Sequence, residues 1–237
     1  MTRYIVLFII FIVSFVQSVA YGQDVKTYVP ANCEALIPIV KTESKTFMPN
    51  FKEVWYYNAL IEHESCISLK HSKCCSPKAK LSTKREYGAG VGQITKAYNE
   101  DGSIRFDALG DLKKRYNDEL RELSWLNIHD RVDLQVRTMV LMTRTNYNQL
   151  LAVKSELERI RMVDSAYNGG LKAVLNARIA CGLAAGCDSQ QWFGHTERYI
   201  NKSKKPLYAG RSALDINLHH VKDVTVTRRD KYRDRLD

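Results

Sequence analysis

The chain has 237 residues, which is enough for one sizeable core or for a core with a small lobe. Its 45% hydrophobic and 26% charged residues exclude wholesale disorder, and 12 Gly with 5 Pro exclude a collagen-like or linker-dominated chain. The formal net charge of +10 favours a polyanionic partner, such as nucleic acid, anionic lipid or an acidic cell-wall polymer, without choosing among them.

The N-terminus has the layout of a secretory signal peptide. Arg3 precedes an apolar run over residues 5–16, and small residues follow at Ala20 and Gly22. We therefore expect residues 1–22 to be a signal peptide. The alternative is an uncleaved anchor, with transient membrane association through residues 4–20. In either case we expect the body to be exported to the periplasm or to the extracellular cell-wall space.

The first half of the body reads as an arm, a helix and an irregular insertion. Residues 23–52 form an N-terminal arm with little periodicity, and residues 51–65 have the apolar spacing of a helix that ends near Glu64. Residues 66–86 read as an irregular insertion stapled by sulfur. A glycine-rich turn follows over 88–93, and a short helix is expected from Ile94 onward.

The second half is predicted to be helical. Helices are expected over 107–123, 130–151, 155–167 and 171–180, and partly over 190–202. Ser155 and Glu158 form a capping-box pattern. Residues 221–226 alternate briefly like a strand. The region over 206–237 is expected to be a basic C-terminal tail, exposed or loosely ordered from Lys222 to Asp237. The expected fold class is mainly α, with the main domain over 53–205 and irregular, disulfide-stapled loops.

Six cysteines in an exported chain are compatible with three disulfides. Cys181 and Cys187 enclose a small flexible loop and are expected to pair. Cys66 is expected to pair with one of Cys74 and Cys75, and Cys33 with the other. A zinc site is the competing interpretation, but the sequence has no CxxC pattern, so no metal is expected.

The first candidate for chemistry is Glu64, followed by Ser65 at the predicted helix end. Backbone carbonyls of the last turn disfavour further negative charge there, which suits a carboxyl group that donates a proton. The alternative is an ordinary solvated glutamate. Glu62 lies two residues earlier and points elsewhere on the helix, so both carboxylates cannot serve one pocket.

Three further segments carry polar groups beside flexible backbone. The glycine-rich segment 86–95 contains Gly90 and Gln93, whose side chain can both donate and accept hydrogen bonds. Tyr167 and Asn168 stand at a helix end before two glycines. Glu197 and Tyr199 follow in a fourth segment, where the tyrosine could be a core residue or could stack on a sugar face.

Taken together and in this order, the four segments resemble the lytic transglycosylases with a soluble-lytic-transglycosylase catalytic domain, over residues 54–201. The segment 86–95 looks especially like that of phage-encoded members. The chain departs from the family at Gly92, where the family has Met, in the inverted order of Thr196 and Glu197, and in a wide gap between Glu64 and Gln93. The residues that match the family pattern or flank it are Glu64, Ser65, Ser82, Gly90, Gln93, Tyr167, Asn168, Glu197 and Tyr199.

The resemblance implies a lysozyme-like fold and cleavage of the β-1,4 bond between N-acetylmuramic acid and N-acetylglucosamine in peptidoglycan. A 1,6-anhydromuramyl end would form, with Glu64 acting as general acid and then as base. The other matched residues would bind the sugar. No metal or organic cofactor is implied, and peptidoglycan glycan strands are the expected partner of a monomeric enzyme.

Three other functions remain open at this stage. A lysozyme-like muramidase would need a second carboxylate, for which Asp101, Asp107 and Glu86 are candidates. A catalytically inert wall-binding or assembly protein is the second. A nucleic-acid-binding module rests on net charge alone, and export and cysteines count against it. A phage lysis enzyme (an endolysin) and a bacterial wall-remodelling enzyme are both compatible with the sequence.

Overall fold

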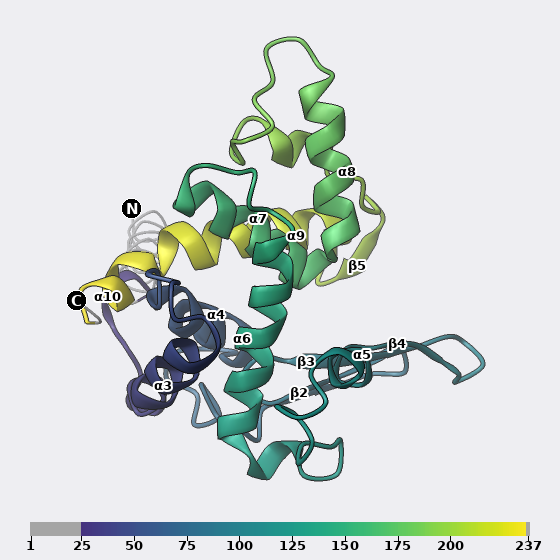
Figure 1. Ribbon diagram of the computed structural model, residues 1–237. Coiled ribbons are helices and arrows are strands. Elements are labelled where there is room, and N and C mark those ends of the chain that lie inside the picture. Colours follow the sequence, from purple (N-terminus) through teal and green to yellow (C-terminus); the bar gives the residue numbers. More distant parts are fainter. Residues whose placement is uncertain (1–24, 236–237) are drawn as a thin grey trace, which may run out of the picture.

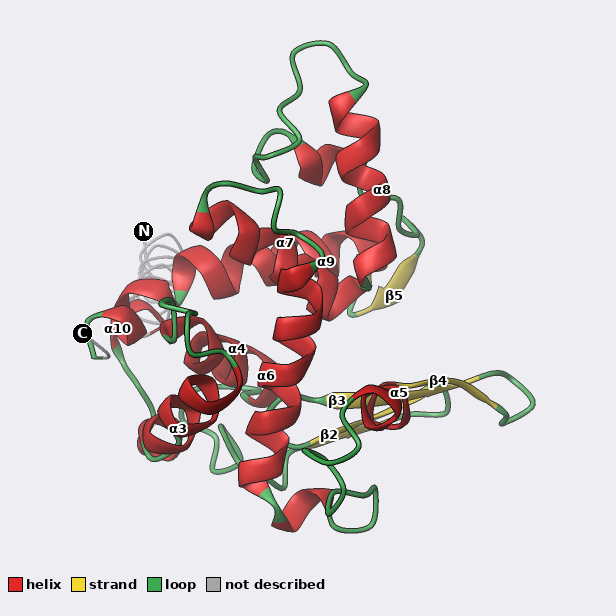
Figure 2. Cartoon of the chain, in the orientation of Figure 1, coloured by secondary structure: helices red, strands yellow, loops and turns green. Residues whose placement is uncertain are grey.

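The computed structural model describes residues 25–235 of the chain, and about half of them lie in helices (Figures 1 and 2). A small antiparallel sheet accompanies the helices. The predicted helices and paired cysteines are therefore present, but helices make up only about half of the described residues, and the sheet was not predicted. The signal-peptide prediction for residues 1–22 and the alternative anchor over 4–20 lie outside the described residues.

The N-terminal arm is helical and belongs to the core. It contains α2 (Ala31–Glu34) and α3 (Ile37–Phe47), and α4 (Trp55–Ser65) follows. Helix α3 packs against α6, and Val40 on α3 is fully buried. The segment expected to be an arm with little periodicity therefore contains two helices. Pro38 stands in the first turn of α3, where a proline does not interrupt helical hydrogen bonds.

A four-stranded antiparallel meander occupies the region predicted to be an irregular insertion, a turn and a short helix. The order of strands is β1 (Lys80–Ser82), β2 (Glu86–Ala89), β3 (Ile94–Tyr98) and β4 (Ile104–Asp107). Register pairs Gly88 with Thr95 and Lys96 with Asp107. The expected helix from Ile94 is wrong, because pairing between strands stabilises an extended conformation that short-range spacing does not reveal.

The elements of the second half are α5 (Ala108–Arg115), the 3-10 turn η1 (Ile128–Asp130), α6 (Val132–Asn148), α7 (Glu156–Gly169), α8 (Leu171–Gly182) and the 3-10 turn η2 (Thr196–Tyr199). Three helices of this half, α6, α7 and α8, follow the prediction closely, whereas the helix expected over 107–123 ends at Arg115 and the segment 190–202 contains only a short 3-10 turn. Ser155 caps α7 as expected, by accepting a bond from the Glu158 amide. The reciprocal bond of a capping box is replaced, because the Glu158 carboxylate binds Arg161 and the Trp192 amide.

The C-terminal segment is packed onto the helical body. It forms β5 (Pro206–Tyr208), β6 (Arg211–Ser212), α9 (Ala213–Lys222), the π-helical turn η3 (Asp223–Thr227) and α10 (Arg229–Arg233). Val221, Val224 and Tyr232 are completely buried. The expectation of an exposed tail, with a strand over 221–226, is therefore wrong. Apolar side chains at helical spacing enter the core, and several charged side chains pair with α4.

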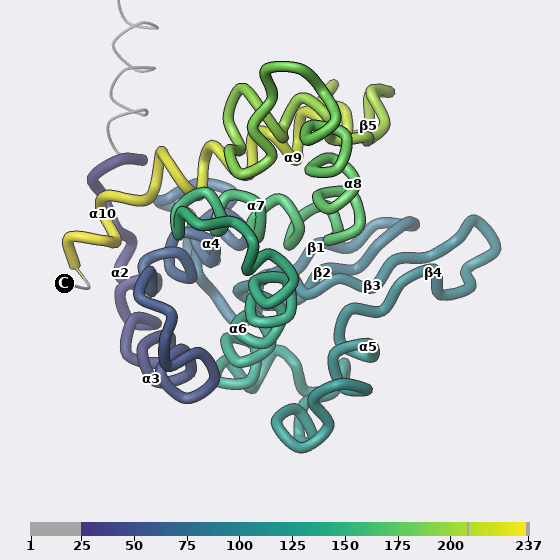
Figure 3. Tube along the Cα trace, turned by 45° about the horizontal axis from the view of Figure 1, so that its top comes forward, coloured from purple at the N-terminus to yellow at the C-terminus, as the bar shows by residue number. Residues whose placement is uncertain are grey.

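Figure 3 shows this yellow segment passing along α7 and α4, which agrees with the contacts of α9 with α7 and of η3 and α10 with α4. One hydrophobic core extends from Val29 to Tyr232. Both ends of the described chain therefore belong to the same folded body as the predicted main domain.

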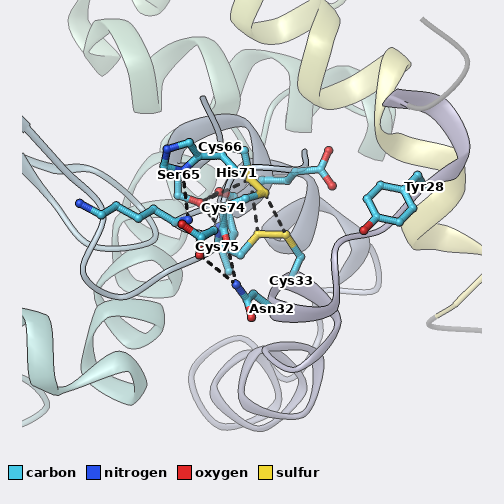
Figure 4. The surroundings of a disulfide bond; sticks show 12 residues. Tyr28, Asn32, Cys33, Ser65, Cys66, His71, Cys74 and Cys75 are labelled. Carbon is cyan, nitrogen blue, oxygen red and sulfur yellow. Dashed lines mark hydrogen bonds between the residues drawn. A yellow bond between two sulfur atoms is a disulfide. The ribbon is translucent and has the colours of Figure 1, made fainter. Parts of the chain in front are cut away.

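Three disulfides form as the sequence predicts: Cys33–Cys75, Cys66–Cys74 and Cys181–Cys187. The first two lie side by side at the end of α4 (Figure 4). They fasten α2 and the loop before β1 to that helix end. In the described part of the chain, no helix is long and apolar enough to cross a membrane.

Candidate active site

Glu64 lies in the last turn of α4, with 17% of its side chain exposed. Its Oε1 atom accepts a hydrogen bond from Nε2 of His220, at 2.8 Å. His220 belongs to α9, and only 2% of the residue is exposed. This helix lies in the region over 206–237 that the sequence assigned to a basic C-terminal tail. The carboxylate is thus held at one oxygen, by a partner from the far end of the chain.

His220 is bound on both sides by acids. Its Nδ1 atom lies 2.7 Å from Oδ2 of Asp164, a completely buried residue of α7. Burial by itself lowers the pKa of His220, but the charges and hydrogen bonds of Asp164 and Glu64 outweigh it and raise this pKa to about 10. At neutral pH the ring is therefore an imidazolium, which donates one hydrogen bond to Glu64 and one to Asp164.

A second histidine lies beside this chain of acids and base. The ring of His63 meets that of His220 edge to face, with centroids 4.3 Å apart. His63 Nδ1 lies 2.6 Å from Asp223 Oδ2, which also accepts a 2.7 Å hydrogen bond from Arg228 Nε. Burial raises the pKa of Asp223, but His63 and Arg228 outweigh it and hold this pKa below its usual range. Beside the His220 ring, Asp223 is therefore paired with both His63 and Arg228.

Tyr167 joins the glycine-rich loop to the acid. Its hydroxyl donates a 2.7 Å hydrogen bond to the carbonyl of Gly92. Burial raises the pKa of Tyr167, and the nearby charge of Glu64 raises it further, so the phenol remains a proton donor. Three of the four predicted segments, those of Glu64, Gly92 and Tyr167, are thus brought together by the fold.

The departure from the family at Gly92 has a steric cause. A Cβ atom at Gly92 would lie 2.5 Å from Cγ of Met139 and 2.8 Å from the Tyr167 hydroxyl. Met139 comes from α6 and is completely buried. A methionine side chain therefore fills the space beside the loop, but it is supplied by α6 instead of by the loop itself.

The remaining loop residues are held by Gln135, a buried residue of α6. Gln135 Oε1 accepts a 2.9 Å bond from the Val91 amide, and a Cβ at Gly90 would lie 2.3 Å from this oxygen. Gly90 also has a φ of 76°, a conformation that favours glycine. The half-buried side chain of Gln93 donates to the Gly90 carbonyl at 2.8 Å. One of the two N–H donors of the Gln93 amide is thereby engaged within the loop, and its second N–H and its oxygen remain as hydrogen-bonding groups for a ligand.

Asn168 is exposed, and its side chain is oriented by α9. Its Oδ1 accepts a 2.9 Å bond from Nδ2 of Asn217, a fully buried residue. A Cβ at Gly169 would lie 2.7 Å from the same Nδ2 atom and 2.4 Å from Cε of Lys202. Gly169 therefore makes room for the contacts that bring the C-terminal segment to the end of α7.

Other predicted site residues have structural partners. Ser65 is buried: its hydroxyl donates to the Ile61 carbonyl and accepts from the Cys75 amide, so it fastens the disulfide loop (Figure 4). Ser82 lies exposed on β1, opposite Tyr87. Glu197 accepts a bond from the Gly194 amide within its own turn, and Tyr199 packs against the core.

The three candidates for a second carboxylate are engaged within the sheet region. Asp101 accepts bonds from the amide and hydroxyl of Ser103 in the turn between β3 and β4. Asp107 caps α5 and accepts a bond from the indole of Trp125. Glu86 begins β2 and pairs with Ala97.

Among the described residues, four cysteines lie close enough together for their sulfur atoms to be considered as metal ligands. The sulfur atoms of Cys33, Cys66, Cys74 and Cys75 lie within 4.8 Å of one another. Each is joined in a disulfide, and a disulfide lacks the thiolate that binds a metal.

Comparison with family models, with curated proteins and with solved structures finds no match for this chain. The sequence reasoning missed His220, Asp164, Gln135 and Met139. One signal could have located His220: Ser212 and Asp215 form a complete capping box, a pattern that predicts the start of a helix before an apolar run.

Proposed function

We propose that this protein is a peptidoglycan lytic transglycosylase with a lysozyme-like fold, and that Glu64 is its general acid and base. The observation that carries the proposal is the partly exposed Glu64 carboxylate at a helix end, next to Tyr167 and to the loop of Gly92. A carboxyl group with one oxygen held and the side chain partly accessible can exchange a proton with a bound sugar.

In the proposed reaction Glu64 donates its proton to the oxygen of the glycosidic bond as the bond to C1 of the muramyl residue breaks. The resulting carboxylate then accepts the proton of the muramyl C6 hydroxyl, whose oxygen forms the new bond to C1. The proton count of the enzyme is restored and no water is consumed. The exposed Asn168 amide and the Gln93 amide oxygen would hydrogen-bond the sugars.

The surroundings of Glu64 favour this reaction over hydrolysis. The acid linked to Glu64 through His220 is Asp164, which is completely buried and bonded to the imidazolium. A buried acid cannot activate water on the opposite face of a bound sugar, which an inverting muramidase requires. Asp101 and Asp107 are bonded within the sheet region.

The biological setting proposed is the cell wall, reached by export. The positive net charge suits a wall polymer that carries lactyl and peptide carboxylates. The three disulfides suit an oxidising compartment. A lysis enzyme of a phage and a wall-remodelling enzyme of a bacterium would both use this chemistry.

The test is mass spectrometry of purified peptidoglycan digested with wild-type protein and with Glu64→Gln, each produced in an oxidising compartment. Anhydromuropeptides from wild type alone are the expected result. Reducing ends would support the muramidase instead. No products from folded, disulfide-bonded protein that still binds peptidoglycan would support an inert wall-binding protein.

A further inference from the structure

Glu64, His220 and Asp164 form a continuous hydrogen-bonded chain across α4, α9 and α7. The two links measure 2.8 and 2.7 Å, and exposure falls along the chain from 17% at Glu64 to 2% at His220 and zero at Asp164. This arrangement has the form of an acid at the surface with a buried base and a second acid behind it. Burying two charged groups is costly, so their retention behind a surface acid calls for an explanation in terms of that acid.

We propose that His220 and Asp164 are positioning residues for Glu64, which they orient and whose negative charge they stabilise during proton transfer. The inference rests on the proposed function. With Oε1 bound to His220, the second oxygen of Glu64, Oε2, is the one that exchanges the proton. Donation of that proton leaves a carboxylate, and a charge-assisted hydrogen bond from the imidazolium to Oε1 strengthens as the negative charge develops.

The protons balance without a further reactant. His220 keeps both ring protons throughout, one shared with Glu64 and one with Asp164. Glu64 loses its Oε2 proton to the glycosidic oxygen as the C1–oxygen bond breaks. It regains a proton from the C6 hydroxyl as the new C1–oxygen bond forms.

Asp164 has a separate task in this arrangement. A buried imidazolium is stable only when its charge is paired, and Asp164 pairs it on the side away from the substrate. The other groups around the ring are His63, which meets it edge to face, Asp223, which binds His63, and Arg228, which binds Asp223. Asp164 therefore supplies the charge that keeps His220 protonated when Glu64 is itself protonated.

The competing explanation is a clamp that merely holds α9 on α4. The two roles differ in their dependence on charge. His220→Gln keeps a hydrogen-bond donor of similar reach but removes the positive charge. Loss of a clamp alone would lower the stability of the variant without a selective fall in kcat, whereas loss of a positioning imidazolium would lower kcat in the folded protein.

The experiment measures kcat and KM on soluble glycan strands for wild type, His220→Gln and Asp164→Asn. His219→Gln, the exposed neighbour on the same helix, is the matched control. For His220→Gln we expect kcat to fall about tenfold to a hundredfold with KM unchanged, because the cation that stabilises the developing negative charge is lost. His219→Gln should match wild type.

A folded His220→Gln protein with the wild-type kcat would overturn the inference and leave the proposed function intact. Absence of anhydro products from wild type would instead refute the proposed function. If His220→Gln fails to fold, nitrogen-15 NMR of the wild-type imidazole provides the test. We expect both ring nitrogens of His220 to carry protons at about pH 8, and a neutral ring at that pH would overturn the inference.

Discussion

Two glutamates of α4, only two residues apart, have opposite surroundings. Glu62 is completely buried and accepts hydrogen bonds from Arg228, from Lys231 at 2.6 Å and from the Tyr232 hydroxyl at 2.6 Å. Glu64 is partly exposed and has a single oxygen bound to His220. Both sets of partners come from the same C-terminal segment.

The difference shows how one docked segment can serve two purposes. On the Glu62 side, two cations and a phenol surround the carboxylate and leave it no capacity for a substrate. On the Glu64 side, one imidazolium orients the carboxylate and leaves one oxygen accessible. Saturated hydrogen bonding fixes a structure, whereas partial hydrogen bonding leaves a group available for chemistry.

The largest expected effect is on activity, at Glu64. Glu64→Gln should reduce the formation of anhydromuropeptides by about a thousandfold, because the variant can neither donate nor accept the proton. Its free energy of unfolding should change little, since an amide of the same shape can still accept the bond from His220. Product chromatography and urea unfolding measure the two quantities. If the variant retained activity, Glu64 would not be the general acid and base.

The next effect is on stability, at Glu62. Glu62→Gln leaves Lys231 without its charged partner and leaves Arg228 with Asp223 alone, in a buried site, at a cost of about 3 kcal/mol or more in unfolding free energy. Burial lowers the pKa of Lys231, so part of the cost is relieved by loss of its proton. Urea unfolding followed by tryptophan fluorescence measures the change, with Glu64→Gln as the control. Equal stability of the two variants would contradict the comparison.

A smaller effect is expected at Gly92, beside the Glu64 side of the helix. Gly92→Ala places a methyl group against Met139 and the Tyr167 hydroxyl, which should cost about 2 kcal/mol of unfolding free energy and lower activity. Gly182→Ala is the matched control, because its Cβ would meet Ser189 at an ordinary 3.7 Å. The same urea assay compares them. If the Gly92→Ala variant were as stable as the Gly182→Ala variant, the loop would not be closely packed at Gly92.

The remaining effect is the dependence of stability on pH. Burial lowers the pKa of His220, but Asp164 and Glu64 outweigh it, so that folding raises this pKa from 6.5 to about 10. The contribution of His220 to stability is therefore complete below pH 6.5 and is lost as pH rises through about 10. Asp223 behaves oppositely: its contribution is present above its ordinary pKa of 3.8 and is lost as pH falls through its depressed pKa. Unfolding free energies measured across pH should therefore decline toward alkaline pH and toward acidic pH. His220→Gln should flatten the alkaline decline, and an unchanged decline would exclude His220 as its cause.

The sequence predicted those features that depend on local pattern. The helix ending near Glu64, the long helix α6, the Ser155 cap and the disulfides all follow from spacing or from loop length. The sheet and the docked C-terminal segment depend on contacts between distant residues. His220 meets Glu64 across 156 positions, and no local spacing announces such a pair.

The glycines of the site illustrate the same limit. Gly92 is unusual as a sequence position but is explained once Met139 is seen to occupy the space of its missing side chain. Ser65 follows Glu64 directly and suggested a role in binding, yet its hydroxyl holds the Cys75 amide. Adjacency to Glu64 in the sequence therefore did not predict the structural role of Ser65.

The measurement that tests the central claim most directly is digestion of peptidoglycan in water enriched in oxygen-18, followed by mass spectrometry of the new muramyl ends. If Glu64 transfers a proton to the leaving sugar and takes one from the C6 hydroxyl, the new ends carry no heavy oxygen and are lighter by one water than reducing ends. Heavy oxygen at C1 of the new muramyl ends would show that water is the nucleophile, and would contradict the account.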